Sequence, residues 1–205
     1  MEYKSTIKSR PYFYKETKIV AQLINKELNS NYIENINDIK IKAIKDNLFQ
    51  VERETRRKEI ASTVIRRLSS LNNYLIYQIG KSSIETSKII VIYSIWKTDR
   101  LFMEFINEVF KEKIVLKDMY IRDSDFNIFF QSKMEQSERV NSWGEYTFKK
   151  LKQVYIKLLF ESGLIVNQNG DREIRIPIIE NDVRQAIIEN GDRLFIEAIE
   201  GKCSI

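Results

Sequence analysis

The stretch Ser83–Phe110, SIETSKIIVIYSIWKTDRLFMEFINEVF, decides how the rest of the chain must fold. Its first half, Ile84–Trp96, places apolar side chains on almost every side of a helix, which predicts a buried helix covered on all faces. In its second half, apolar residues recur over Leu101–Phe110 with the spacing of an amphipathic helix. Thr98 or Asp99 is expected to cap this second helix.

The composition predicts an all-α, multi-helical protein. Of the 205 residues, 43% are hydrophobic, and only 2 Pro and 6 Gly are present, so long linkers are not expected. We place a lobe boundary at the Gly80–Ser83 break. Residues 1–80 then form a helical, helix-turn-helix-like lobe, and residues 81–205 form a central helical hairpin plus a winged-helix-like lobe with one small β-hairpin.

Charge is distributed unevenly along the chain. The net charge is +5, yet the first 67 residues hold 15 Lys and Arg against 9 Asp and Glu, so the remainder sums to −1. A basic front half favours an anionic partner, most simply nucleic acid. A lysine-rich composition spread over a solvated surface is the alternative that stays open.

Several classes of chemistry are excluded or disfavoured. The chain has no His, which excludes His-based triads and His metal ligands. The pairs Asp123/Asp125 and Asp99/Glu104 are typical of helix caps rather than of a metal nuclease, and no P-loop, GxGxxG or GxSxG motif occurs. We therefore predict no catalytic residues, no cofactor and no metal site.

The chain also has the features of a cytoplasmic protein. Its one Cys, Cys203, precludes an intramolecular disulfide and suits a reducing compartment. The first ten residues lack the apolar core of a signal peptide. The apolar run Ile89–Ile92 is far shorter than the roughly 20 residues that span a bilayer.

The front half contains three expected helices. An extended arm, Met1–Tyr14, precedes them, and its aromatic residues either pack on the core or stack on a partner. Helices are expected over Lys15–Leu28, Asn37–Asn47 and Thr55–Leu71, although the alternation Ile39–Lys42 leaves a strand open for the second.

The third of these helices is the candidate recognition helix. Arg56 and Arg67 fall within about 20° of each other on a helical wheel. Arginine side chains suit phosphates and guanine edges. The candidate nucleic-acid-binding residues of the front half are Arg53, Arg56, Arg57, Lys58, Arg66 and Arg67. The alternative is that these cations pair with the acids Glu52, Glu54 and Glu59.

The C-terminal part has the order of expected elements that is typical of a winged helix. We expect a helix from a Ser142 cap to about Glu161, with Tyr146 facing inward, and a stop at Gly163. Strands Leu164–Val166 and Glu173–Ile176 follow, joined through an Asn-Gly turn. Candidate nucleic-acid-binding residues here are Lys149, Lys152, Arg172 and Arg175. A hairpin that only covers a core edge is the alternative.

In the order and spacing of its motifs, the chain resembles the BrxA family. The resemblance rests on five segments: Asn47–Gln50 before a Thr/Arg-rich helix, Ile65–Leu68, Asp99-Arg100-Leu101-Phe102-x-x-Phe105, Trp143 opening a helix, and Leu158-x-x-Glu161-Ser162-Gly163-Leu164-Ile165. It implies a small all-helical component of a BREX phage-defence system, similar to the RNA-binding factor NusB, that binds DNA through helix-turn-helix-like parts. The family's label as an inner-membrane protein does not fit this sequence.

The resemblance implies no catalytic residues. It places binding at Arg56, Arg57, Arg66 and Arg67, and also at the C-terminal Lys149, Lys152 and Arg175. The first hypothesis is thus a non-catalytic component of a BREX system that binds double-stranded DNA, with other BREX proteins as partners. The alternatives are a NusB-like RNA-binding transcription factor and an assembly protein that binds no nucleic acid. The sequence does not indicate an oligomeric state.

Overall fold

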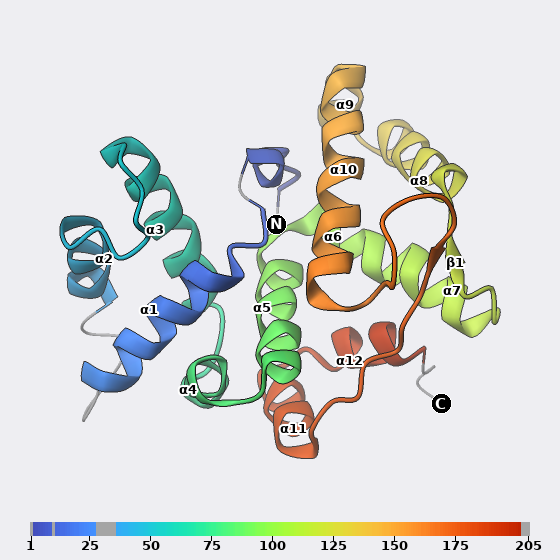
Figure 1. The fold of residues 1–205 in the computed structure, drawn as a ribbon. Coiled ribbons are helices and arrows are strands. Elements are labelled where there is room, and N and C mark those ends of the chain that lie inside the picture. The colour runs from blue at the N-terminus through green and yellow to red at the C-terminus, as the bar shows by residue number, and fades with distance from the viewer. Residues whose placement is uncertain (1, 10, 28–35, 202–205) are drawn as a thin grey trace. The chain divides into compact units, whose positions relative to one another are not determined.

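A computed structural model describes residues 2–9, 11–27 and 36–201 (Figure 1). It is mainly helical, with one small β-sheet, as the sequence predicts. The chain divides into two compact units. Unit 1 holds residues 1–12, 99–178 and 191–205, and unit 2 holds residues 13–98 and 179–190.

Unit 2 is built around the helix that the apolar run predicts. Its helices are α1 (Tyr14–Glu27), α2 (Ile36–Lys45), α3 (Glu54–Leu68), α4 (Asn73–Lys81), α5 (Ile84–Thr98) and α11 (Asn181–Glu189). The side chains of Ile89–Trp96 are buried all round α5, and α1, α3 and α4 pack against it. The alternating segment Ile39–Lys42 is helical, so α2 is a helix and not a strand. Leu28, the expected end of α1, lies outside the described residues.

Gly80 does not mark a boundary between units. A Cβ atom at this position would lie 2.5 Å from the Asn25 side chain, so the glycine allows α1 and α4 to approach closely. From α1, Asn25 donates to the Tyr77 carbonyl and Gln22 donates to the Gly80 carbonyl. The division lies instead between Thr98 and Asp99, so the two helices of the expected central hairpin belong to different units.

Two asparagines join α11 to unit 2, although α11 is far away in sequence. Asn72 caps α4 by accepting from the Leu75 amide, and its side-chain amide donates to the Ala186 carbonyl. Asn190 donates to the Ser70 carbonyl and to the Tyr93 hydroxyl. These hydrogen bonds explain why residues 179–190 leave the C-terminal part and complete the front unit.

Unit 1 contains the remaining helices and the small antiparallel sheet. Its elements are the 3₁₀ turn η1 (Thr6–Ser9), α6 (Arg100–Phe105), the π-helix η3 (Ile106–Phe110), α7 (Lys111–Val115), β1 (Tyr120–Ile121), α8 (Asp123–Gln136), α9 (Glu138–Asn141), α10 (Glu145–Ser162), β2 (Arg172–Glu173) and α12 (Arg193–Glu200). Asp99 caps α6 by accepting from the Phe102 amide, which confirms one of the two expected caps.

Aromatic rings form the centre of unit 1. Phe105 of α6 stacks on Phe126 of α8 and packs edge-on against Phe129, and Tyr155 of α10 contacts Phe102 and Phe105. Aromatic pairs with these offsets add to the stability that area burial provides. This cluster fixes α8 and α10 relative to α6.

The N-terminal arm packs on unit 1 and is not fully extended. Tyr3, Ile7 and Tyr12 are buried, which agrees with core packing rather than stacking on a partner. The Tyr3 hydroxyl donates to Glu104, and its ring lies 4.0 Å from the Arg100 guanidinium. The segment over Thr6–Ser9 forms a 3₁₀ turn where an extended chain was expected.

The predicted hairpin is present and gains a third segment. Ile165 pairs with Ile174, Val166 donates to the Glu173 carbonyl, and Arg175 donates to the Leu164 carbonyl. β1 pairs antiparallel with β2 on the other side, with Ile121 opposite Arg172. Sequence reasoning missed β1 because two residues carry no readable alternation.

Candidate nucleic-acid interface

Helix α10 presents a polar stripe to solvent and an apolar face to the core. Leu151, Tyr155, Leu158 and Leu159 are buried. The exposed stripe consists of Tyr146, Lys149, Gln153 and Lys157, which follow one another at helical spacings of three and four residues. Tyr146 is 68% exposed, so its expected inward position is wrong. The stripe therefore combines two ammonium groups, an amide and a phenol on one face.

The start of α10 differs from the expected one. Ser142 belongs to the end of α9, where its hydroxyl donates to the Arg139 carbonyl. Gly144 takes the N-cap position, so Trp143 precedes the helix instead of forming part of it. At the other end, Gly163 adopts φ 83°, the left-handed stop that the sequence predicts.

Lys152 and Arg172 do not belong to the exposed stripe. Both bind the carboxylate of Asp123 at the start of α8, at 2.7 and 2.9 Å. Arg172 is buried beside the Phe126 ring, and its Nε donates to the Gln168 carbonyl. The Lys152 ammonium and then the Arg172 guanidinium hold the pKa of Asp123 below its usual range. Arg172 thus has a structural position, and the expectation that it is available to a ligand is corrected.

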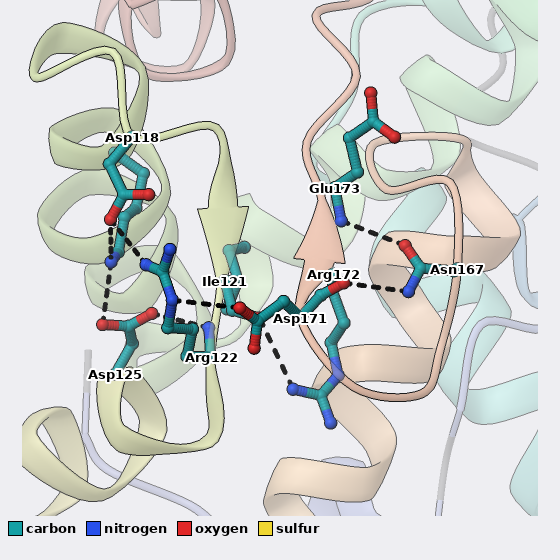
Figure 2. Close-up of polar contacts among 9 residues, drawn as sticks. Asp118, Ile121, Arg122, Asp125, Asn167, Asp171, Arg172 and Glu173 are labelled. Atoms are coloured by element: carbon teal, nitrogen blue, oxygen red, sulfur yellow. Dashed lines mark hydrogen bonds and ion pairs between the residues drawn. The ribbon is translucent and has the colours of Figure 1, made fainter.

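The Asn167 side chain makes several hydrogen bonds within the loop between the two hairpin strands. The side-chain amide of Asn167 donates to the Asn169 carbonyl. It also donates to the Asp171 carbonyl and accepts from the Glu173 backbone amide (Figure 2). Gly170 adopts φ 67°, a left-handed conformation that favours glycine. The loop therefore has a defined conformation and exposes Gln168 and Asn169.

A second ion-pair network anchors this loop to β1 and α8. Arg122 binds Asp118 at 2.7 Å and reaches Asp171 in the loop at 3.2 Å (Figure 2). Lys113 binds both Asp118 and Asp125. Hydrogen bonds from Arg122 and then Lys113 lower the pKa of Asp118 to about 2. Arg175, by contrast, is exposed and makes no ion pair among the described residues.

The candidate cations at the start of α3 are mostly engaged with the protein itself. Arg56 pairs with Glu59 at 2.9 Å, and Lys58 pairs with Glu54 at 2.6 Å. Arg57 donates to the Ile44 and Glu52 carbonyls. The alternative reading, in which neighbouring acids neutralise these side chains, therefore holds for Arg56 and Lys58. Glu52 accepts from Arg57 through its backbone carbonyl and not through its carboxylate.

Arg67 is buried, and the predicted surface does not include it. Only 2% of the residue is exposed, and its guanidinium lies 5.9 Å from the Phe13 ring, which Arg56 also approaches at 5.4 Å. The helical wheel correctly places the two arginines on one face, but an aromatic residue covers that face. Arg66 remains exposed on α3, and Arg53 remains exposed at its N-cap.

The structure therefore sorts the ten candidate residues into three groups. Those exposed without an ion pair among the described residues are Arg53, Arg66, Lys149 and Arg175. Those with an acid or carbonyl partner are Arg56, Arg57, Lys58 and Lys152. Those buried are Arg67 and Arg172. Tyr146 and Lys157 were missed, although their spacing from Lys149 on the helix provides the signal.

Among the described residues, no group of three or more metal-ligating side chains comes together. Over the same ranges, no helix combines the length and apolarity that crossing a membrane requires.

Comparisons with known proteins agree on the family to which the chain is related. The family model described as BrxA matches residues 1–191. The BREX protein BrxA of Bacillus cereus (strain H3081.97) is 52% identical over 200 residues, which cover 98% of this chain and 97% of that protein. A crystal structure of an uncharacterized protein from Magnetospirillum magneticum superposes with a TM-score of 0.78 at 20% identity, covering 98% of this chain and 100% of the other. The chain belongs to the BrxA family.

Proposed function

We propose that the protein is a non-catalytic, cytoplasmic component of a BREX phage-defence system and that it binds double-stranded DNA. Membership of the BrxA family and the name of the Bacillus cereus relative support the first part. The exposed stripe of α10 carries the second part, because it aligns Lys149, Gln153 and Lys157 along a rigid helix. Lysines bind phosphates, and glutamine can read the edge of adenine.

The elements around α10 support a winged-helix mode of binding. The order α6–α7, β1, α8, α10, hairpin is that of a winged helix, with α10 in the place of the recognition helix. The loop that Asn167 holds takes the place of the wing, where Gln168 and Asn169 would reach the backbone or minor groove. Arg175, at the base of the hairpin, is the cation best placed to accompany it.

Unit 2 contributes a smaller basic surface. Arg66 is exposed on α3 and Arg53 at its N-cap, whereas the cations between them have acid or carbonyl partners. Because affinity for DNA rises with each phosphate neutralised, we expect α3 to add to binding without directing it.

The test is the salt dependence of binding to duplex DNA. Replacing Lys149 and Lys157 by Ala should reduce the slope of log affinity against log salt by about 2. Fluorescence anisotropy between about 50 and 200 mM salt measures this slope. A parallel titration with single-stranded RNA of equal length distinguishes the proposal from an RNA-binding role.

The matched control removes the same charge elsewhere in unit 1. Lys117→Asn with Arg193→Ala lowers the net charge equally at exposed positions outside α10. Asn suits position 117 because the backbone there has φ 59°. If this control reduces the slope as much as the α10 variant does, net charge alone governs binding and the assignment to α10 fails. Tighter binding to RNA than to duplex DNA would favour the NusB-like alternative.

A further inference from the structure

A groove of opposite charge lies on the other side of α8. It has a volume of about 360 Å³ and is formed by η3, α7, the turn before β1, and α8. Its lining contains four carboxylates against one ammonium group: Glu108, Glu112, Asp118, Asp125 and Lys113. Its apolar lining residues are Val109, Leu116, Ile128 and Phe129. Nucleic acid and anionic lipid are both repelled by such a surface.

Part of the negative charge in this groove is not neutralised. Lys113 and Arg122 both bind Asp118, Lys113 also binds Asp125, and the buried Lys133 binds one oxygen of Glu108 at 2.6 Å. Glu112 is exposed and makes no ion pair within the described ranges. It lies four residues after Glu108, a spacing at which two like charges destabilise a helix unless a cation joins them.

Two exposed aliphatic side chains lie beside these carboxylates. Ile128 of α8 is 69% exposed and Leu116, after α7, is 67% exposed, and both line the groove. Water-exposed apolar side chains from separate elements that line one concave surface are typical of an interaction site. The groove thus offers an apolar contact and an anionic contact to the same ligand.

The backbone around the groove is irregular on one side. Glu108 and Val109 belong to the π-helix η3, a conformation that occurs frequently at functional sites. Lys117, directly after Leu116, adopts φ 59°, a left-handed conformation that is uncommon for a residue other than glycine. Glu108 lies within the first feature and Leu116 directly precedes the second, and both residues line the groove.

We propose that this groove binds a cationic, amphipathic segment of a partner protein, with an aliphatic side chain against Leu116 and Ile128 and a Lys or Arg beside Glu112. Charge complementarity selects this occupant, because Glu112 in the lining has no ion-pair partner among the described residues. An amphipathic helix that lays its apolar face into a groove is a common mode of recognition. This inference does not depend on DNA binding.

The probe for this site is a fluorescent peptide of about 14 residues, four helical turns, made of Lys and Leu at amphipathic spacing. The variant Glu112→Gln with Ile128→Ser should weaken its binding by about tenfold or more. A control variant, Glu135→Gln with Leu194→Ser, changes one exposed carboxylate and one exposed aliphatic residue outside the groove. That control should bind the peptide as the parent protein does.

Two peptide controls separate charge from shape. A peptide with Ser in place of Leu keeps the charge, and a peptide with Glu in place of Lys keeps the apolar face; both should bind more weakly than the Lys/Leu peptide. The proposal is overturned if the Ser peptide binds equally well, or if no peptide binds more tightly than about 1 mM. Equal losses in the groove variant and the control variant would overturn it as well.

Further measurements make the outcome decisive. The single variant Glu112→Lys changes an exposed position and should abolish peptide binding without loss of fold, as circular dichroism would verify. Sedimentation velocity tests the other occupant: a dimer that the groove variant dissociates would show that a second copy of the chain fills the groove, against the proposal. Affinity for duplex DNA should stay unchanged in both variants, and a fall in that affinity would assign the groove to DNA and overturn the inference.

Discussion

Helices α3 and α10 both carry cations that the sequence marks as candidates for nucleic-acid binding, yet these cations have different environments. On α3, Arg56 and Lys58 pair with neighbouring acids and Arg67 is buried. On α10, the Tyr146–Lys157 stripe faces solvent along its whole length. Lys157 has an exposed ion pair with Glu161 at 3.5 Å, of the same kind as the Lys58–Glu54 pair on α3. Exposed pairs contribute little energy, so the clearer difference between the helices is that Arg67 is buried on α3 whereas both stripe lysines are exposed on α10. The comparison shows that the availability of a cation depends on its neighbours more than on its helical face.

The largest expected effect is on the free energy of unfolding, and it tests whether the buried Arg67 stabilises the fold. Replacing Arg67 by Ala should lower the free energy of unfolding by about 2–4 kcal/mol, because a buried guanidinium and its packing are lost. Replacing its exposed neighbour Arg66 by Ala should change that energy by less than about 0.5 kcal/mol. Urea denaturation of both variants gives the answer, and equal losses would show that Arg67 is not held as the structure has it.

The next effect concerns the acids that neutralise the cations. Asp123→Asn should release Lys152 on α10 and raise DNA affinity about threefold to tenfold at low salt. Glu59→Gln should release Arg56 on α3 and raise affinity by less. Anisotropy titrations compare the two variants. If Glu59→Gln has the larger effect, α3 rather than α10 is the principal DNA-binding helix.

A smaller effect on stability is expected when the pH is lowered. Arg122 and then Lys113 hold the folded-state pKa of Asp118 at about 2, below its ordinary value of 3.8. A lowered folded-state pKa means that this stabilising contribution is present above pH 3.8 and is lost as the pH falls toward 2. Unfolding free energies between these pH values should therefore fall less steeply for Asp118→Asn than for the parent protein. An identical pH dependence in both proteins would show that the Arg122 network adds nothing.

The smallest expected effect is at Tyr155. Its hydroxyl is buried without a hydrogen-bond partner among the described residues, and burial raises its pKa well above the usual value. Tyr155→Phe should therefore change the free energy of unfolding by less than about 0.5 kcal/mol, or stabilise the protein. Tyr93→Phe is the matched control, because the Tyr93 hydroxyl bonds Asn190, and it should cost about 1 kcal/mol. A larger cost at Tyr155 would indicate a bound water.

Local signals in the sequence predicted most of the elements. The apolar run Ile84–Trp96, the cap at Asp99, the glycine stop at Gly163 and the hairpin after it all lie where the residues place them. Each depends on contacts within a few residues, such as the Asp99 side chain and the Phe102 amide. The helical wheel likewise placed Arg56 and Arg67 on one face of α3.

The division into units could not be predicted from the same signals. Gly80 has the appearance of a break, but it permits the close contact of α1 with α4, which are far apart in sequence. Likewise, Asn72 and Asn190 join α11 to unit 2 through hydrogen bonds that span more than one hundred residues. Partners at such separations leave no local pattern.

By itself, the sequence determined the helical class, the buried α5, the hairpin and the presence of a surplus of arginine and lysine. Only the tertiary structure decided which of those cations a ligand can reach. Phe13 covers Arg67, Asp123 holds Lys152 and Arg172, and the α10 stripe stays open. The physical reason is that helix formation depends on neighbours along the chain, whereas burial and neutralisation of a charge depend on neighbours in space.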